Sequence, residues 1–141
     1  ICPKGADVRQ KKYGAEGGAG LIVTEIIAAH ESAGFSSQLL RADKTGADAY
    51  ATLARTIHSA GAKIFAQLFH SGREITRTAD GMAAVAFAPS AVPNERFHIM
   101  PREMPDVMIR EIIAGFASAA QMMQDVGYDG VEIVGSHGYL P

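Results

Sequence analysis

The chain contains 141 residues, of which 48% are hydrophobic and 20% are charged, the composition of a globular domain that can bury a core. Its formal net charge of -2 gives no basic field for nucleic acid or for an anionic membrane surface, which favours a small molecule as the partner. Cys2 is the single cysteine, so the composition excludes a disulfide framework and a zinc or iron–sulfur ligand set within these residues.

The two ends of the sequence lead us to expect a piece of a longer, cytoplasmic protein. The chain opens on Ile1 and stops at Pro141, a few residues after an apolar run. The sequence contains no apolar stretch long enough to span a membrane and no recognisable targeting segment. We therefore treat residues 1–141 as one partial domain that is incomplete at both ends.

The first part of the chain predicts a loop, a strand and an irregular segment. Residues 1–20 are rich in glycine and are predicted to form a loop, with a helical turn near residues 8–15. The run from residue 21 to 23 is short, apolar and partly β-branched, which is typical of a buried strand. Residues 30–43 are polar and lack a period, so we expect them to be irregular.

A helix and a second strand follow. The helical spacing of Tyr50, Leu53, Ala54 and Ile57 predicts a helix over residues 46–59 with these side chains on its buried face. Gly61 stands where a glycine commonly ends a helix. Residues 63–68 then form the second predicted strand.

The last part of the sequence predicts a long irregular segment, a helix and a third strand. Residues 70–105 carry several glycines and prolines without a sustained period, and loops of this length are usually functional or flexible. Pro105 suits a first helical position, and the helix is predicted to continue until Gly127. Residues 130–134 form the third strand. The apolar stripe of that helix consists of Ile109, Ile112, Ile113, Phe116, Ala119, Ala120 and Met123.

Strand, helix, strand, helix, strand requires right-handed crossovers and a parallel sheet, and therefore an α/β fold. An open doubly wound sheet and a closed (β/α)8 TIM barrel both fit this order. A nucleotide-binding open sheet would place a glycine-rich phosphate loop after its first strand, and residues 25–29 contain no glycine. We therefore favour the barrel. A complete barrel needs about 250 residues, so the chain would form a fragment of one.

Polar residues follow the predicted strands, where the active sites of barrels lie. Gln67 ends the second strand, and His70 and Arg73 follow in the next turn. A side-chain amide offers a donor and an acceptor together, which suits the edge of a flavin or pyrimidine-like ring. Alternatively, Gln67 caps a neighbouring strand and Arg73 forms a surface ion pair. The residues alone leave these alternatives open.

The third strand ends in a second candidate site. Gly135 and Gly138 bracket His137, which allows a tight turn that projects the imidazole, and Tyr139 adds a phenol. Imidazole and phenol groups can bind an oxyanion or transfer a proton. An isolated loop histidine is usually satisfied by backbone groups, but the position at the end of a parallel strand favours function.

Other titratable residues are better explained by structural roles. An unpaired carboxylate inside an apolar strand is costly, so we expect Glu25 and Glu132 to pair with arginines from strands outside the chain. His58 lies near a helix end, where a cap or a dipole partner is favoured over a ligand. His30 and His98 are loop histidines without a visible partner.

The motifs together resemble the Old Yellow Enzyme family of FMN-dependent NADH:flavin oxidoreductases. The resemblance implies that the chain covers roughly the second to fourth strands of the barrel. It also implies an enzyme that transfers hydride from NAD(P)H to FMN and then to an activated alkene. The resembling segments are residues 17–25 (GGAGLIVTE), 67–73 (QLFHSGR), 88–91 (APSA), 127–133 (GYDGVEI) and 136–140 (SHGYL).

The resemblance also implies roles for individual residues. Gln67 corresponds to the glutamine that hydrogen-bonds the pyrimidine edge of the flavin, and the backbone of Ile26 lies beside the isoalloxazine ring. His137 corresponds to the second member of a substrate-binding pair, and Tyr139 to a tyrosine that donates a proton in some members. Val134 stands where the first member of the pair is usually histidine, and valine cannot donate a hydrogen bond.

The ending from residue 136 to 141 is more similar to larger relatives, which include trimethylamine dehydrogenase, N-methyl amino-acid demethylases and dienoyl-CoA reductases. Those members add a [4Fe-4S] cluster and a second nucleotide-binding region for FAD beyond the point where this chain stops. Alkene reduction and oxidative N-demethylation are therefore alternatives, and the full-length protein could form a homo-oligomer. In the family, the first and last strands also contact FMN, so we expect the 141 residues alone to retain FMN weakly.

Two readings outside flavin chemistry remain open. The chain could be a non-catalytic barrel remnant that acts through a partner protein, because a partial barrel leaves open sheet edges. It could also belong to a barrel hydrolase or aldolase. That reading leaves Gln67 unexplained.

Overall fold

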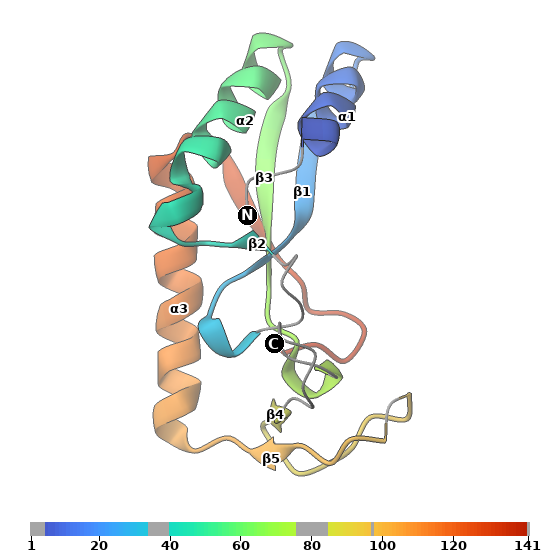
Figure 1. Cartoon of the computed structure of the whole chain (residues 1–141), viewed down its shortest axis with the longest axis vertical. Helices are drawn as coiled ribbons and strands as arrows, with labels where there is room; N and C mark the ends of the chain where they lie inside the picture. Colours follow the sequence, from blue (N-terminus) through green and yellow to red (C-terminus); the bar gives the residue numbers. More distant parts are fainter. Residues whose placement is uncertain (1–4, 34–39, 76–84, 97, 141) are drawn as a thin grey trace.

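The computed structural model describes residues 5–33, 40–75, 85–96 and 98–140 (Figure 1). Strands and helices alternate through most of this length. The helices are α1 (Gly5–Glu16), α2 (Ala47–Ser59) and α3 (Asp106–Asp125), and the 3-10 turns are η1 (Glu31–Ala33), η2 (Lys44–Gly46) and η3 (Gly72–Glu74). The strands are β1 (Leu21–Ala28), β2 (Leu40–Arg41), β3 (Lys63–Phe69), β4 (Phe87–Ala88), β5 (Arg102–Glu103) and β6 (Gly130–Ile133).

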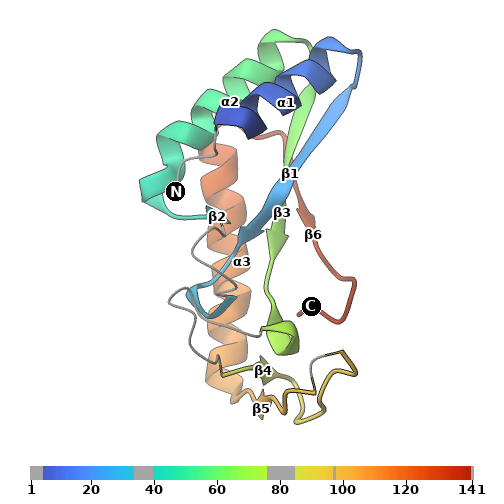
Figure 2. The ribbon, with the colours of Figure 1, turned by 45° about the vertical axis from the view of Figure 1, so that its right-hand side comes forward.

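The main sheet is parallel, with the strand order β2-β1-β3-β6. The helices lie on one face of this sheet (Figure 2). A doubly wound sheet would carry helices on both faces, whereas a barrel carries them only on its outside. The sheet is therefore a fragment of a (β/α)8 barrel, as predicted from the lack of glycine after the first strand, and the face turned away from the helices is the face that lines the barrel.

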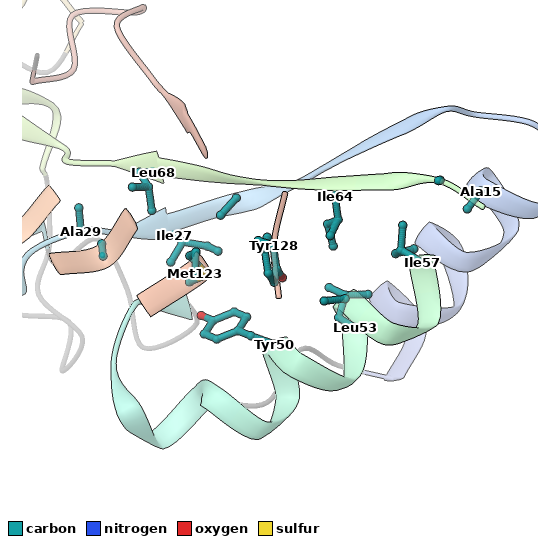
Figure 3. Packing of buried hydrophobic residues seen from close by; sticks show 14 residues of the cluster. Ala15, Ile27, Ala29, Tyr50, Leu53, Ile57, Ile64, Leu68, Met123 and Tyr128 are labelled. Atoms are coloured by element: carbon teal, nitrogen blue, oxygen red, sulfur yellow. The ribbon is translucent and has the colours of Figure 1, made fainter. Parts of the chain in front are cut away.

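The hydrophobic core lies between the sheet and the helices. Along β3, Ile64, Ala66 and Leu68 alternate with half-buried residues and are at most 1% exposed, as the period of a strand requires. They pack against the apolar face of α2 and against Met123 of α3 (Figure 3). Each large side chain buried here contributes roughly 1.5–3 kcal/mol of transfer free energy.

The predictions for α2 and its flanks are confirmed. All four side chains expected on its apolar face are buried, namely Tyr50, Leu53, Ala54 and Ile57. Gly61 ends this segment with a φ of 81°, a left-handed conformation that side chains rarely adopt. The chain then enters β3 directly, and the hydroxyl of Tyr50 donates to the carbonyl of Arg41 at 2.8 Å.

Helix α1 corrects the prediction of a mostly irregular amino-terminal segment. It spans twelve residues, Gly5–Glu16, where only a short helical turn was expected. The helix is polar, so it has no apolar stripe for periodicity to detect. It is stabilised instead by an i,i+4 ion pair between Lys12 and Glu16 at 3.4 Å and by Ala15, which is buried in the core.

Helix α3 also differs from its prediction in two details. Pro105 precedes the helix as its N-cap, one position before the first helical residue. Ile113, expected on the buried stripe, is 64% exposed. It borders an apolar hollow of about 210 Å³ that also touches Ile109 and Leu140. The stripe is therefore wider than the contact that the sheet makes with this helix.

The long segment between β3 and α3 forms little regular structure among the described residues. It contains η3 and the two short strands β4 and β5, which pair in parallel with Phe87 opposite Arg102. Residues 34–39 of the first irregular segment and residues 76–84 of this long segment lie outside the described residues.

Candidate active site

The inner face of the sheet carries a row of three residues at the same level. Ile26 of β1 is in register with Gln67 of β3, which is in register with Glu132 of β6. The register between β1 and β3 shifts between Val23 and Ile26, as at a β-bulge, a device that redirects side chains near functional sites. Ile26 and Gln67, the two residues predicted to contact a flavin, are thus neighbours.

The side-chain amide of Gln67 already makes one hydrogen bond to a residue of this row. Its Nε2 atom donates to Oε2 of Glu132 at 3.1 Å, and its backbone N–H donates to Oγ1 of Thr24 at 3.2 Å. Among the described residues, no hydrogen bond to Oε1 of Gln67 is found, and one Nε2 hydrogen is free. The half-exposed amide therefore offers a donor and an acceptor side by side, which fits the alternating groups on the edge of a flavin pyrimidine ring.

The loop after β6 brings His137 and Tyr139 together. His137 has a φ of 60° and Gly138 a φ of 75°, so two consecutive residues are left-handed and the chain turns sharply. The turn is closed by the N–H of Tyr139, which donates to the carbonyl of Ser136 at 3.1 Å. The two rings lie 6.1 Å apart between centroids. A non-glycine residue in this conformation carries strain, which is common at functional sites.

The His137 imidazole is exposed and has a local partner. Its Nδ1 atom lies 2.8 Å from Oγ of Ser136, with which it shares a hydrogen bond. That bond occupies Nδ1 and leaves Nε2 to meet a ligand. The structure therefore does not show the alternative in which backbone groups alone hydrogen-bond the His137 imidazole.

Strand β3 anchors Tyr139 and the residue after it. The rings of Phe69 and Tyr139 pack edge-on with centroids 4.7 Å apart. The N–H of Leu140 donates to the carbonyl of His70 at 3.1 Å, which forms an antiparallel bridge. The loop after β6 is thus attached to the end of β3.

A cleft of about 220 Å³ opens beside Tyr139. Arg73 lines it, although the sequence left open whether this arginine forms a surface ion pair. No ion pair of Arg73 is present within the described part of the chain. The lining combines the turn after β3, the loop after β4 and the loop after β6, from residues Gly72, Arg73, Ala88, Pro89, Ser90, Val92, Gly138, Tyr139 and Leu140.

Val134 is half-buried and directly follows β6, where its N–H donates to the carbonyl of Leu68 at 3.0 Å. This backbone bond continues the pairing of β6 with β3 past the end of the strand. The side chain adds an apolar surface to a site whose other proposed members are polar.

A buried polar chain near this loop was not predicted. The N–H of Gly72 donates to Nδ1 of His70 at 3.0 Å, and Nε2 of His70 lies 2.9 Å from Oγ of Ser32. The same hydroxyl lies 2.7 Å from Nδ1 of His30. His30 therefore has partners, contrary to expectation. These residues follow two different strands, β1 and β3, and only the spacing of His30 and Ser32 hinted at their contact.

The other predicted structural residues find partners inside the described chain. Glu25 is exposed, with its carboxylate 3.8 Å from Nζ of Lys11, and Glu132 is bonded to Gln67 as described above. Neither carboxylate is buried among the described residues, and pairing with arginines from strands outside the chain stays a prediction. His58 lies in the last turn of α2, as expected of a dipole partner, and its Nε2 is 2.7 Å from Oδ2 of Asp129.

Asp129 also accepts from Nζ of Lys63 at 2.8 Å and from the N–H of Ile64 at 3.0 Å. These donors hold the pKa of its carboxyl well below the usual range, Lys63 most strongly and His58 next.

His98 donates its backbone N–H to the carbonyl of Asn94 at 3.2 Å. No described helix is long and apolar enough to cross a membrane, and no cluster of metal-binding side chains occurs within the described ranges.

Comparison with known proteins points to one family. The sequence model of the NADH:flavin oxidoreductase / NADH oxidase family matches residues 3–141. The chain is 39% identical over 129 residues to an NADH oxidase of Thermoanaerobacter brockii, an alignment that covers 89% of this chain and 20% of that protein. It is 37% identical over 126 residues to a metal reductase of Desulforamulus reducens, covering 89% of this chain and 19% of the relative.

Shorter relatives and a solved structure agree. The chain is 33% identical over 125 residues to an NADPH dehydrogenase of Clostridium acetobutylicum, with 88% of this chain and 36% of that protein aligned. Its fold matches an old yellow enzyme homologue from Zymomonas mobilis with a TM-score of 0.78 and 25% identity, over 95% of this chain and 40% of that one. The chain thus spans well under half the length of these relatives.

Proposed function

Because the chain belongs to the NADH:flavin oxidoreductase / NADH oxidase family, we propose that the protein is an FMN-dependent oxidoreductase. It transfers hydride between NAD(P)H, the flavin and a small organic substrate. Residues 1–141 form part of its FMN-binding barrel domain. We further propose that it acts in the cytoplasm.

The amide of Gln67 carries this proposal. It lies on the barrel-lining face, beside Ile26, with a free donor and a free acceptor among its described contacts. Gln67 would hold the pyrimidine edge of FMN, and the half-buried Ile26 would shield the ring from water. Glu132 orients the amide by accepting from Nε2. The chemistry supplied by bound FMN would be hydride transfer, between the reduced nicotinamide and an alkene or from a methylated amine.

His137 and Tyr139 are proposed to handle the substrate. Nε2 of His137 is free to donate a hydrogen bond to a carbonyl oxygen or another anionic group, because Ser136 occupies Nδ1. The phenol of Tyr139 would supply the proton that accompanies the hydride. Phe69 fixes the ring plane of Tyr139 by edge-on packing, so that the phenolic oxygen is held in place.

Val134 reduces the number of hydrogen-bond donors proposed to meet the substrate. It is proposed to line the substrate site where relatives place a second donor, so a substrate oxygen would be bound by one imidazole only. We therefore keep two reactions, reduction of an activated alkene and oxidation of a methylated amine. The similarity to two relatives of which this chain spans about a fifth supports a larger protein, in which regions outside these residues carry a [4Fe-4S] cluster and FAD.

The reaction classes can be separated with the purified full-length protein. The absorbance of bound flavin is followed after addition of NADPH and a cyclic enone, and separately after addition of an N-methylated amino acid and an electron acceptor. Enone-dependent reoxidation supports alkene reduction, and amine-dependent reduction supports amine oxidation. If neither compound changes the oxidation state of the flavin, this chemistry is wrong.

An alternative is a non-catalytic barrel remnant that acts through a partner protein. It is favoured by Ile133, which is 54% exposed on the edge strand β6, because an open apolar edge promotes association. Sedimentation of the purified protein distinguishes the two. A monodisperse monomer that binds FMN contradicts the remnant, whereas a flavin-free assembly supports it.

A further inference from the structure

The hydrogen-bond contacts of His30, Ser32 and His70 determine where the protons of this buried chain lie. Gly72 donates its N–H to Nδ1 of His70, so the proton of the neutral ring is on Nε2 and is donated to Oγ of Ser32. The Ser32 hydroxyl then donates to Nδ1 of His30, which also accepts the N–H of Ser32 at 3.2 Å. Each donor in this chain has one acceptor, which leaves a single arrangement.

Packing also holds the two rings. His70 is 1% exposed, and its ring stacks on that of His30 with centroids 6.3 Å apart and planes 24° apart. His30 in turn lies against α3, where a side chain at Gly115 would come within 3.2 Å of its ring. The segments that follow β1 and β3, together with helix α3, thus fix the imidazole of His70.

The imidazole of His70 also binds the turn after β3, and this turn contacts the loop after β6 that carries Tyr139. The bond from Gly72 to Nδ1 sets the first turn after β3, where Gly72 has a φ of 56°. A Cβ atom at Gly72 would lie 3.1 Å from both Cβ and N of Leu140, so the turn touches the loop directly. The carbonyl of His70 binds the N–H of Leu140.

We propose that His70 is a positioning residue, which holds Tyr139 in its reactive place through the Gly72 turn and Leu140, with Ser32 and His30 fixing its ring. The role in catalysis rests on the proposed function of Tyr139, but the positioning itself does not. The side chain of His70 touches neither His137 nor Tyr139, the two residues proposed to contact the substrate. Burial and the neighbouring His30 lower its pKa to about 4, so the ring stays neutral near pH 7 and keeps Nδ1 as an acceptor.

Two measurements on protein without added substrate test the positioning. In the protein labelled with 15N-histidine, long-range 1H–15N correlation should show His70 with its proton on Nε2, and the signals should vanish in His70→Asn. Amide hydrogen exchange then reports the turn. His70→Leu should accelerate exchange at Gly72 and Leu140 about tenfold, the effect of roughly one lost buried hydrogen bond.

Conservative and control variants separate positioning from general destabilisation. In His70→Asn, Oδ1 can take the place of Nδ1, so protection of Gly72 should return to within about threefold of wild type. Ser32→Ala removes only the hydroxyl between the rings. Gly72 should still keep the His70 proton on Nε2, but the ring loses its partner at Nε2, so exchange at Gly72 should rise. His58→Gln removes a histidine bonded to Asp129 and should leave the exchange of Gly72 and Leu140 unchanged.

The outcomes decide the proposal. A His70 proton on Nδ1, or wild-type exchange at Gly72 and Leu140 in a folded His70→Leu variant, overturns it. If His70→Leu does not fold, wild-type exchange at Gly72 in Ser32→Ala overturns it instead. If the exchange results hold but the protein binds no flavin, the proposed function fails while the positioning stands. If flavin chemistry is present, His70→Leu should lower kcat more than it raises KM, and His70→Asn should recover part of kcat.

Discussion

The ring of Tyr139 meets the ring of Phe69 edge-on, with centroids 4.7 Å apart and planes at 85°. Phe69 is the last residue of β3 and is fully buried, so the position of the phenol is set by the neighbouring strand. Packing and chemistry at Tyr139 can therefore be separated by substitution.

Tyr139→Phe keeps the packed ring and removes only the hydroxyl. The free energy of unfolding should change by less than about 0.5 kcal/mol, while turnover should fall about 10²-fold if the phenol supplies a proton. Phe69→Leu should instead lower the free energy of unfolding by about 1–2 kcal/mol. Urea denaturation and steady-state kinetics measure both. Equal kinetic losses in a stable Tyr139→Phe and a destabilised Phe69→Leu would contradict a chemical role for the phenol.

Gly72→Ala should disturb the contact between the turn after β3 and the loop after β6. The new Cβ would lie 3.1 Å from Leu140, and the residue would keep a φ of 56°. Backbone strain and the close contact together should cost about 1–3 kcal/mol of unfolding free energy. Gly135→Ala is a matched control, since a Cβ there meets nothing within 4 Å. Similar urea midpoints for Gly72→Ala and wild type would refute the close approach.

Protonation of His70 should destabilise the protein in acid. Burial, followed by the neighbouring His30, lowers the pKa of His70 from 6.5 to about 4. Between these values the unfolded chain binds a proton that the folded chain does not, so stability falls as the pH drops from 6.5 to 4. The full loss is about 3 kcal/mol. It is complete near pH 4, below which both states are protonated.

Urea unfolding of wild type and His70→Asn from pH 7 to pH 4.5 measures this contribution. The difference in unfolding free energy between them should shrink as the pH falls, because asparagine does not titrate. His58→Gln serves as the control. Asp129, whose pKa is lowered, loses its contribution only below about pH 3.8, outside this window. A difference that is constant with pH would show that His70 titrates normally.

His137→Ala should impair substrate handling with little effect on the flavin. Loss of the donor at Nε2 should raise KM or lower kcat/KM by about 10- to 100-fold. The flavin content should match that of wild type, since His137 lies on the loop after β6 and Gln67 on β3. Kinetics and absorbance measure the two quantities on one preparation. Unchanged kinetics, or loss of flavin, would contradict the assigned role.

The alternation of strand and helix was readable from sequence because buried faces impose their own periods. The apolar face of α2 and the strand β3 were predicted nearly to the residue, since the core selects for apolar side chains at fixed spacing. The polar helix α1 carries no such pattern and was missed. The choice of a barrel over a doubly wound sheet rested on the lack of glycine after β1, and the one-sided placement of the helices confirms it.

The candidate site was only partly predictable. Gln67 and His137 could be found because each follows an apolar strand, where barrel sites form. The contacts of His30 with His70 could not, because they join residues 40 positions apart by packing alone. The burial of Glu25 was mispredicted as well. Its strand pattern suggested burial, whereas its side chain is 72% exposed.

The most direct test is FMN binding by the full-length protein and by Gln67→Ala, measured by visible absorbance after purification and by fluorescence titration of the flavin-free protein. Gln121→Ala, on the exposed face of α3, is the matched control. We predict a stoichiometric yellow complex for wild type and the control, and an affinity lower by about 10- to 100-fold for Gln67→Ala. A wild-type protein that binds no FMN, or a Gln67→Ala variant with wild-type affinity, would contradict the account.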